Sequence, residues 1–558
     1  MECHQGRASK VSVDGAIEEA NVADADTVSE DLGFVNIHYH AAAATKYGKL
    51  AQGGYEYEGQ AYDANFAHVE GYESCTDCHS PHTLEVLTDE CSECHAAADL
   101  KEVRMAGSLV DYDGDGNLEE GIYHEIEGLQ ALLYMAIQDY AEEHSGTAIG
   151  YDSHNYPYFF ADTNADGQIS EDEAVRDNGY NAWTPRLLKA AYNYQLSKKD
   201  PGMYAHGGKY IIQLLYDSVA DLNTVLSTPV DLAEAHRIDH GHFAGSEEAF
   251  RHWDEDGEVP PACSKCHSAP GLPLFLKDGT TISQPPSNGF QCSTCHDDLS
   301  TYSQYEVKEV TFPSGAVVAS EDPTTNLCMN CHQGRQSTVQ VRNATEGLED
   351  DAVAEKLGFM NVHYFAAGAT KFGTEAKGGY EYEGKDYVGV FRHVPKYAGC
   401  ITCHSTHKLE VKVEECSGCH PQMNEGGLEA IRLTAPDYDG DGDTSEGVAQ
   451  ELEALHQALY TAIQDYASNV VNAALVYDSH NYPYFFNDTN GNGEPDPEEA
   501  TRDNRYGTWT PTLLKAAYNY QYVAKDPGGF AHNGKYIAQL LYDSLESLNA
   551  TTEAMVRP

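Results

Sequence analysis

Basic residues are scarce in this chain of 558 residues, which has 34 Lys and Arg against 89 Asp and Glu and a formal net charge of −55. A surface of that charge repels polyanions, so nucleic acid and anionic membranes are not expected as partners. Long apolar runs are also missing, because no stretch approaches the roughly 18 consecutive apolar residues of a membrane span. The length alone predicts several domains with cores of their own.

Cysteine, by contrast, recurs in a fixed pattern, since 14 of the 15 cysteines lie in seven copies of Cys-x-x-Cys-His. This is the attachment signature of haem c: two thiols bond to the porphyrin edge and the histidine binds the iron. Structural zinc is the alternative, because it also uses Cys-x-x-Cys pairs. A histidine after every one of seven pairs favours haem. The predicted thioether cysteines are Cys75, Cys78, Cys91, Cys94, Cys263, Cys266, Cys292, Cys295, Cys328, Cys331, Cys400, Cys403, Cys416 and Cys419, and the predicted proximal ligands are His79, His95, His267, His296, His332, His404 and His420.

An eighth motif is present in part. MECHQGR at Met1 matches MNCHQGR at Met329, where Cys328 precedes the matching segment. Cys3 and His4 are therefore expected to be the second thiol and the proximal histidine of an eighth haem, which also explains the odd number of cysteines. We expect the native polypeptide to extend upstream, with a signal peptide and counterparts of the Cys263 and Cys292 motifs, so that two five-haem units result.

The chain contains an internal duplication. LGFVNIHYHAAAATKYG at 32–48 returns as LGFMNVHYFAAGATKFG at 357–373, and DYDGDG recurs at 111–116 and 437–442. Because the spacing between the copies hardly changes, both copies should fold alike. The predicted organisation is a first repeat at 1–228, a two-haem segment at 229–327 that starts the second unit, and a second repeat at 328–558.

The predicted fold class is mainly α with extensive irregular structure, arranged as two tandem units with haem-rich and helical calcium-binding segments. An apolar stripe with spacings of three and four residues predicts an amphipathic helix over 119–142 and a counterpart over 446–467. Thr-Pro at 184–185 and at 510–511 marks helix starts, and further helices are expected over 187–195 and 210–222. The best strand signal covers 306–319 around the turn at 313–315.

The second axial ligand of each iron is predicted from histidines that occur in both copies. A lone histidine is more often an ordinary residue, but retention in both copies of a haem-rich repeat favours ligation. From Cys263 onward, five motifs match five duplicated histidines, which favours two histidines per iron; no methionine recurs as an alternative ligand. Four histidines just ahead of Cys263, among them His236, could ligate instead. The distal candidates are His38, His68, His82, His154, His206, His240, His242, His252, His363, His393, His407, His480 and His532.

Acidic loops form a second chemical theme. Two segments fit the twelve-residue calcium loop with a closing glutamate at Glu173 or Glu499, and the DYDGDG segments start similarly but close only with a later Glu125 or Glu451. Plain acidic turns are the alternative. The predicted calcium ligands are Asp162, Asn164, Asp166, Gln168 and Glu173, then Asp488, Asn490, Asn492, Glu494 and Glu499, then Asp111, Asp113, Asp115, Asn117 and Glu125, and finally Asp437, Asp439, Asp441, Asp443 and Glu451.

On these motifs, on CHQGR after Cys3 and Cys331, and on the aspartate loops beside KAAYNYQ, the chain resembles multihaem c-type cytochromes of the periplasm and outer surface of metal-reducing bacteria. The resemblance covers nearly the whole length. It implies export, haem attachment outside the cytoplasm and electron relay toward extracellular metal or mineral acceptors, sometimes through polymerised filaments. Other redox proteins or further copies of the chain are the implied partners.

Three functions can be considered for a chain with these motifs. The favoured function is an electron carrier, not an enzyme, whose irons all have six ligands. The alternative is a multihaem reductase acting on a small oxyanion at one open iron, which the surplus of histidines and the repulsive surface charge disfavour. A calcium-dependent structural protein does not explain so many haems.

Overall fold

The computed structural model describes residues 2–22, 24–69, 71–92, 94–95, 99–104, 108–239, 241–242, 248–432 and 434–558. They form two compact units, one of residues 1–303 with 407–409 and one of residues 304–406 with 410–558. The segment 229–303 thus groups with the first unit. The predicted repeats are defined by sequence similarity rather than by compactness, so this division does not test them.

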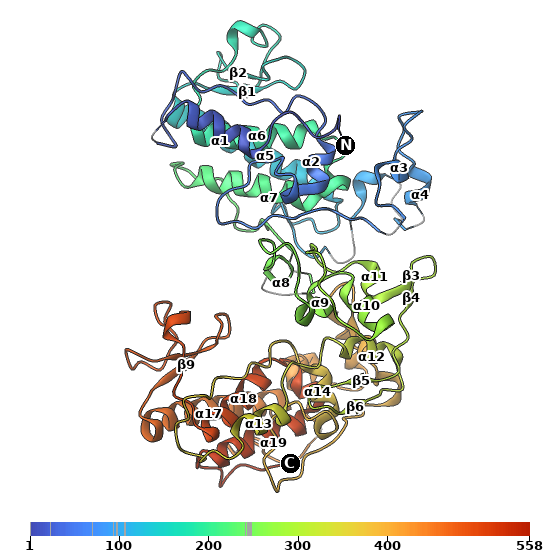
Figure 1. Ribbon diagram of the computed structural model, residues 1–558, viewed down its shortest axis with the longest axis vertical. Coiled ribbons are helices and arrows are strands. Elements are labelled where there is room, and N and C mark those ends of the chain that lie inside the picture. Colours follow the sequence, from blue (N-terminus) through green and yellow to red (C-terminus); the bar gives the residue numbers. More distant parts are fainter. Residues whose placement is uncertain are drawn as a thin grey trace. The chain divides into compact units, whose positions relative to one another are not determined.

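The first unit is built on three long helices, α5, α6 and α7, surrounded by short helices and irregular chain (Figure 1). In chain order its helices are α1 Lys10–Glu19, α2 Ala42–Tyr47, α3 Cys75–Cys78, α4 Thr88–Cys91, α5 Ile122–Tyr140, α6 Pro185–Lys199, α7 Met203–Asn223, α8 Glu248–Arg251, α9 Pro261–His267, α10 Gly271–Asp278 and α11 Cys292–Cys295. Its strands are β1 Ile149–Tyr151, β2 Phe159–Ala161 and β3 His296–Asp298, and β4 covers Ser303–Gln304.

The second unit has a corresponding set of three long helices, α17, α18 and α19 (Figure 1). Its helices are α12 Pro323–Met329, α13 Thr338–Thr345, α14 Ala367–Phe372, α15 Glu414–Ser417, α16 Met423–Gly426, α17 Val448–Tyr466, α18 Pro511–Ala524 and α19 Gly529–Ser547. Its strands are β5 Val310–Thr311, β6 Val317–Val318, β7 His404–Ser405, β8 Glu410–Val411, β9 Leu475–Tyr477 and β10 Phe485–Asn487.

The core of each unit lies where the predicted apolar stripe meets the two later helices. On α5 the stripe residues Ile126, Leu129, Leu133, Ile137 and Tyr140 are all fully buried. The predicted caps are present, because the hydroxyls of Thr184 and Thr510 each accept a hydrogen bond from a backbone N–H three residues later at 3.1 Å. These packed helices are the rigid base from which several histidines project.

Strands are short and pair only locally. β1 pairs with β2 and β9 with β10 in antiparallel two-stranded sheets, with Tyr151 opposite Phe159 and Tyr477 opposite Phe485. The predicted strand signal at 306–319 becomes β5 and β6, where Val310 lies opposite Val318. The expectation of a mainly α protein with extensive irregular structure is confirmed. Within the described ranges, no helix combines the length and apolarity needed to cross a membrane.

Candidate haem-binding sites

Each Cys-x-x-Cys-His motif folds as about one helical turn. In at least five motifs the N–H of the histidine donates to the carbonyl of the first cysteine, as for His79 on Cys75, His420 on Cys416 and His296 on Cys292. Residues three and four apart lie on one face of a turn, so the two thiols and the imidazole project to the same side. All 15 cysteines are free thiols, and each is exposed or half-buried. The motifs therefore offer reactive sulfurs beside one possible metal ligand.

Five motif histidines face a second histidine across a gap of constant width. The ring centroids are 6.1 Å apart for His79 and His206, 6.0 Å for His95 and His68, 6.3 Å for His296 and His407, 6.2 Å for His404 and His532, and 6.1 Å for His420 and His393. In every pair one member follows a Cys-x-x-Cys and the other is a predicted distal ligand. Each pair lies within one compact unit.

This gap matches a metal ion bound from both sides. With metal–nitrogen bonds of about 2 Å and each ring centroid about 1.2 Å behind its nitrogen, two imidazoles on one ion have centroids about 6.4 Å apart. Directly stacked rings without an ion would approach much closer. The residues thus fit haem c, with the two thiols of the motif at the porphyrin edge and one histidine on each face of the iron.

The electrostatics of the pairs favour neutral imidazole, the form that binds metal. Burial lowers the pKa of His68, and the neighbouring His95 lowers it further. In the same way burial and then His532 lower the pKa of His404. Two charged rings at this separation would repel each other in a partly buried site, which favours the neutral form of His68 and His404. His532 differs: burial lowers its pKa, but the Asp526 carboxylate raises it more, so that the net shift is upward.

The distal histidines come from different kinds of structure. His206 and His532 lie in the first turns of α7 and α19, whereas His68 and His393 lie in irregular chain. His407 lies between β7 and β8 and belongs with 408–409 to the first compact unit, as does His296. The paired positions thus combine the rigid core with loops.

Two further motif histidines contact a tyrosine next to a predicted distal ligand. The ring of His4 lies 5.4 Å from that of Tyr39, which follows His38, and the ring of His332 lies 5.3 Å from that of Tyr364, which follows His363. Both distal candidates have left-handed backbone, with φ of 78° and 82°, a strained conformation that functional sites often store.

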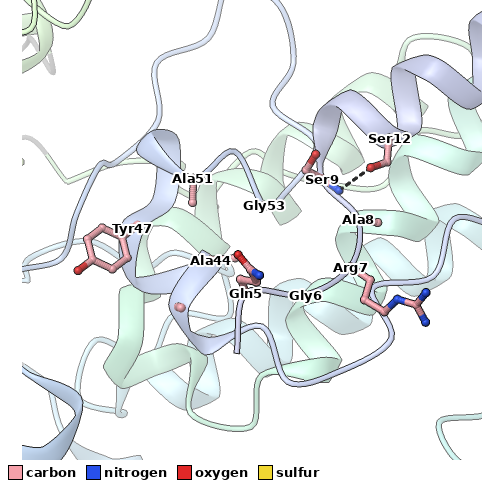
Figure 2. A pocket seen from close by; sticks show the side chains of 11 residues that line it. Gln5, Gly6, Arg7, Ala8, Ser9, Ser12, Ala44, Tyr47, Ala51 and Gly53 are labelled. Atoms are coloured by element: carbon pink, nitrogen blue, oxygen red, sulfur yellow. Dashed lines mark hydrogen bonds between the residues drawn. The ribbon is translucent and has the colours of Figure 1, made fainter. Parts of the chain in front are cut away.

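An open pocket of about 660 Å³ adjoins the segment that follows His4, lined among others by Gln5, Gly6, Arg7 and Tyr47 (Figure 2). The backbone N–H of Ser9 donates to the hydroxyl of Ser12 at 3.1 Å at the start of α1. This helix start holds the chain that forms one wall of the pocket.

His267 of the Cys263 motif and the histidines just before that motif contact Trp and Phe rings and backbone carbonyl groups. His267 lies 5.4 Å from the ring of Trp253, and its Nδ1 is 2.5 Å from the carbonyl of Ala249. His252 lies against Trp253 at 5.0 Å and His242 against Phe290 at 5.6 Å. The Nδ1 of His236 bonds to the carbonyl of Asp111 at 2.8 Å. His240 lies outside the described residues.

His154, His480 and His82 differ from the paired candidates. The side chains of His154 and His480 are each 91% exposed, and each Nδ1 lies 3.2 Å from the hydroxyl of the preceding serine. His82 is exposed on a turn. The structure therefore does not bring these three predicted ligands against a motif histidine in the described part of the chain, because their turns project into solvent.

Neighbouring motifs lie close together. In the second unit the neighbouring thiol of Cys328 is the largest cause of the lowered pKa of Cys400, and the charge of Cys403 adds to burial in raising the pKa of Cys416. Because each sulfur becomes part of a porphyrin edge, such contacts bring two haems next to each other. The motif histidines 332, 404 and 420 thus follow one another in space.

The first unit has similar contacts. His4 is close enough to His79 to lower its pKa, after burial and His206. The nearby thiol of Cys94 raises the pKa of the Tyr302 hydroxyl, and the carbonyl of Tyr302 lies 2.8 Å from the Nδ1 of His296. Tyr302 therefore connects the motif of His95 with that of His296.

Acidic clusters occur at the DYDGDG loops. The carboxylate oxygens of Asp111, Asp113 and Asp115 lie within 4.8 Å of one another, as do those of Asp113, Glu120 and Glu125. Burial raises the pKa of Asp113 to about 7, and the charges of Glu125 and Asp115 add to the rise. Glu125 is fully buried, pairs with Arg104 and accepts from the N–H of Tyr112 at 2.7 Å.

The second unit repeats this arrangement, with Asp437, Asp439 and Asp441 in one cluster and Asp439, Glu446 and Glu451 in the other. Glu120 and Glu446 are missing from the predicted ligand set. An Oε1 atom of each is buried without a hydrogen-bond partner among the described residues. The sequence signal for both residues is a glutamate near the end of each DYDGDG loop.

The twelve-residue loops are organised by backbone hydrogen bonds. Asp162 accepts from the N–H groups of Ala165 and Gly167, both at 2.7 Å. Glu173 accepts from the hydroxyls of Thr163 at 2.7 Å and Ser170 at 2.8 Å, and these contacts lower its pKa to about 2. The side chain of Glu499 is almost fully buried, and its Oε2 atom lacks a partner among the described residues.

Searches against known proteins agree with haem binding. Over 355 aligned residues the chain is 26% identical to C-type polyheme cytochrome OmcB of Geobacter sulfurreducens, an alignment that covers 53% of this chain and 45% of OmcB. It is 24% identical over 559 residues to C-type polyheme cytochrome OmcC of the same species, covering 87% of this chain and 66% of OmcC. The chain thus spans about half to two thirds of the length of these relatives. No family model and no solved structure matches. Together with the seven motifs, the similarity to these two polyheme cytochromes supports the prediction of a multihaem c-type cytochrome.

Proposed function

We propose that this protein carries electrons through a series of covalently bound haems, and that the five paired sites hold irons with two histidine ligands. The observation that carries the proposal is the constant separation of 6.0–6.3 Å between motif and distal imidazoles. An iron bound on both faces has no position for substrate. Its chemistry is then the gain and loss of one electron.

The order of the haems follows from the contacts between motifs. In the second unit, electrons pass between the haems of His332, His404 and His420, because cysteines of successive motifs lie close enough to shift each other's pKa in that sequence. In the first unit, the haems of His4 and His79 are neighbours, and so are those of His95 and His296. The motif of His267 brings the series to eight haems, with the partial motif at Cys3 and His4 included.

We further propose that the protein is exported to the periplasm or the cell surface, because haem c is attached outside the cytoplasm. Other redox proteins, further copies of the chain, or extracellular metal and mineral acceptors would receive the electrons. A net charge of −55 favours partners with basic or cationic surfaces. We also propose that the two halves of the chain arose by tandem duplication and that copies of the chain assemble into a polymerised electron conduit.

The acidic loops are proposed to bind calcium. Carboxylate oxygens that converge within 4.8 Å of one another are the ligands that calcium prefers. The partnerless oxygens of Glu120, Glu446 and Glu499 support this, because an oxygen left without a donor in the protein is available to a cation. The ions would tie α5 and α17 to the loops before them.

Absorption spectra of the reduced protein with and without carbon monoxide test the electron-carrier proposal. We expect low-spin, six-coordinate spectra, potentials mostly below zero, and little change with carbon monoxide, because distal histidines fill the sixth positions. A high-spin signal that carbon monoxide converts completely would contradict the proposal and indicate a reductase with an open iron.

A further inference from the structure

A buried aspartate contacts the distal histidine at one site in each unit. The Nδ1 atom of His206 lies 2.9 Å from both carboxylate oxygens of Asp200, and the Nδ1 atom of His532 lies 2.8 Å from Oδ1 of Asp526. Asp200 is 1% exposed and Asp526 is 4% exposed. The same contact therefore occurs twice, on the first turns of α7 and α19.

The local chain is shaped for this contact. Each aspartate is followed by Pro-Gly, and the histidine N–H donates to the carbonyl of that glycine at 2.9 Å in both units. A Cβ atom on Gly202 would lie 2.7 Å from Cε1 of His206, and one on Gly528 would lie 2.8 Å from Cε1 of His532. Only glycine leaves room for the ring in this position, so the histidine is held against its aspartate.

The contact decides which ring nitrogen carries the proton. An ionised carboxylate can only accept a hydrogen bond, so Nδ1 is the donor and Nε2 keeps its lone pair. The rings also face the motif histidines His79 and His404 at centroid distances of 6.1 and 6.2 Å. A carboxylate on the outer nitrogen of a ligating histidine fixes the ring and raises its basicity.

The other paired sites have different outer contacts. The Nδ1 atoms of His68 and His420 are buried without a hydrogen-bond partner among the described residues. The Nδ1 atom of His296 bonds to the neutral carbonyl of Tyr302. Among the described residues, a buried negative charge on the outer nitrogen of a paired histidine is thus seen at the His79–His206 and His404–His532 sites and not at the other three pairs.

We infer that Asp200 and Asp526 are positioning residues that lower the reduction potential of the irons at His79–His206 and His404–His532 relative to the other paired haems. This inference rests on the proposed bis-histidine ligation. A more basic ligand and a nearby negative charge both stabilise the oxidised iron. On reduction, one electron arrives from a neighbouring ferrous haem, which becomes ferric, while the proton stays on Nδ1.

The test uses Asp200→Asn and Asp526→Asn in the full haem-loaded chain, with each haem followed separately by NMR during a redox titration. In each variant we expect the oxidised-to-reduced ratio of one haem at a fixed potential to fall at least tenfold, which is about 59 mV for one electron. The other haems and the low-spin spectrum should not change. Unchanged potentials in both variants would overturn the inference.

Matched controls are Asp152→Asn and Asp478→Asn. Each of these carboxylates lies 3.6 or 3.5 Å from the Nδ1 of the exposed His154 or His480, so no haem potential should move. A high-spin wild-type protein would instead refute the proposed ligation. If a variant fails to retain haem, histidine nitrogen NMR of the reduced wild type decides: two strongly hydrogen-bonded Nδ1–H protons support the inference, and their absence overturns it.

Discussion

Replacing Glu446 by Gln distinguishes a calcium site from a plain acidic turn. The substitution should lower the stability of a protein that binds calcium there, and should leave stability equal or raise it if the loop binds no cation. The Glu446 carboxylate converges with Asp439 and Glu451, and its Oε1 atom has no hydrogen-bond partner among the described residues. Burial raises the pKa of Glu446, and the charges of Asp439 and Asp441 raise it further. A bound cation would therefore stabilise the Glu446 carboxylate, and without a cation the neighbouring carboxylates repel it.

The expected magnitude depends on whether calcium is present. With saturating calcium, loss of one charged ligand that weakens binding tenfold lowers the unfolding free energy by about 1.4 kcal/mol. For a unit of this size that corresponds to a Tm lower by roughly 3–6 °C. In chelator, removing the charge relieves repulsion, and solvent screening keeps the gain below about 1 kcal/mol, so Tm stays equal or rises slightly.

Differential scanning calorimetry in calcium and in chelator measures both values, and haem content is checked by absorption. Glu120→Gln is the equivalent change in the first unit. Glu498→Gln is the control, because this exposed side chain lies outside both clusters. The reasoning fails if Glu446→Gln has the same Tm as the wild type in calcium, or if calcium does not stabilise the wild type at all.

Two further predictions concern a ligand and a buried carboxyl. His407→Met should leave haem attached, since the thioethers are untouched, and should raise the reduction potential of the iron at His296, because a thioether ligand replaces imidazole. The control His480→Met, at an exposed side chain, should change no haem potential. If the redox titration of His407→Met equals that of the wild type, His407 is not a ligand. Burial raises the pKa of Glu56 to about 7, so the folded state binds its proton more tightly than the unfolded state, and stability is lost as pH rises from about 4.5 to 7. Glu56→Gln should remove up to about 3 kcal/mol of that pH dependence, as measured by urea unfolding across this range, and an identical pH profile would contradict the assignment.

The sequence by itself determined one side of each haem. Cys-x-x-Cys-His places two thiols and a ligand on one helical turn, and an interaction between residues three and four apart needs no tertiary structure. The apolar stripe on α5 and the Thr184 cap are equally local, which is why the helices were predictable within a few residues. The acidic loops were predictable from the sequence for the same reason, because their carboxylates lie close together along the chain.

Tertiary structure decided which histidines face the motif histidines in the five pairs. His206 meets His79 and His532 meets His404 only because α7 and α19 pack beside chain that is distant in sequence. Duplication suggested His154 and His480 as strongly as His206 and His532, yet the first two lie on exposed turns. A repeat copies a surface turn as faithfully as a ligand, so recurrence could not separate them. Packing separates them, because it determines which of the duplicated histidines lie against a motif histidine.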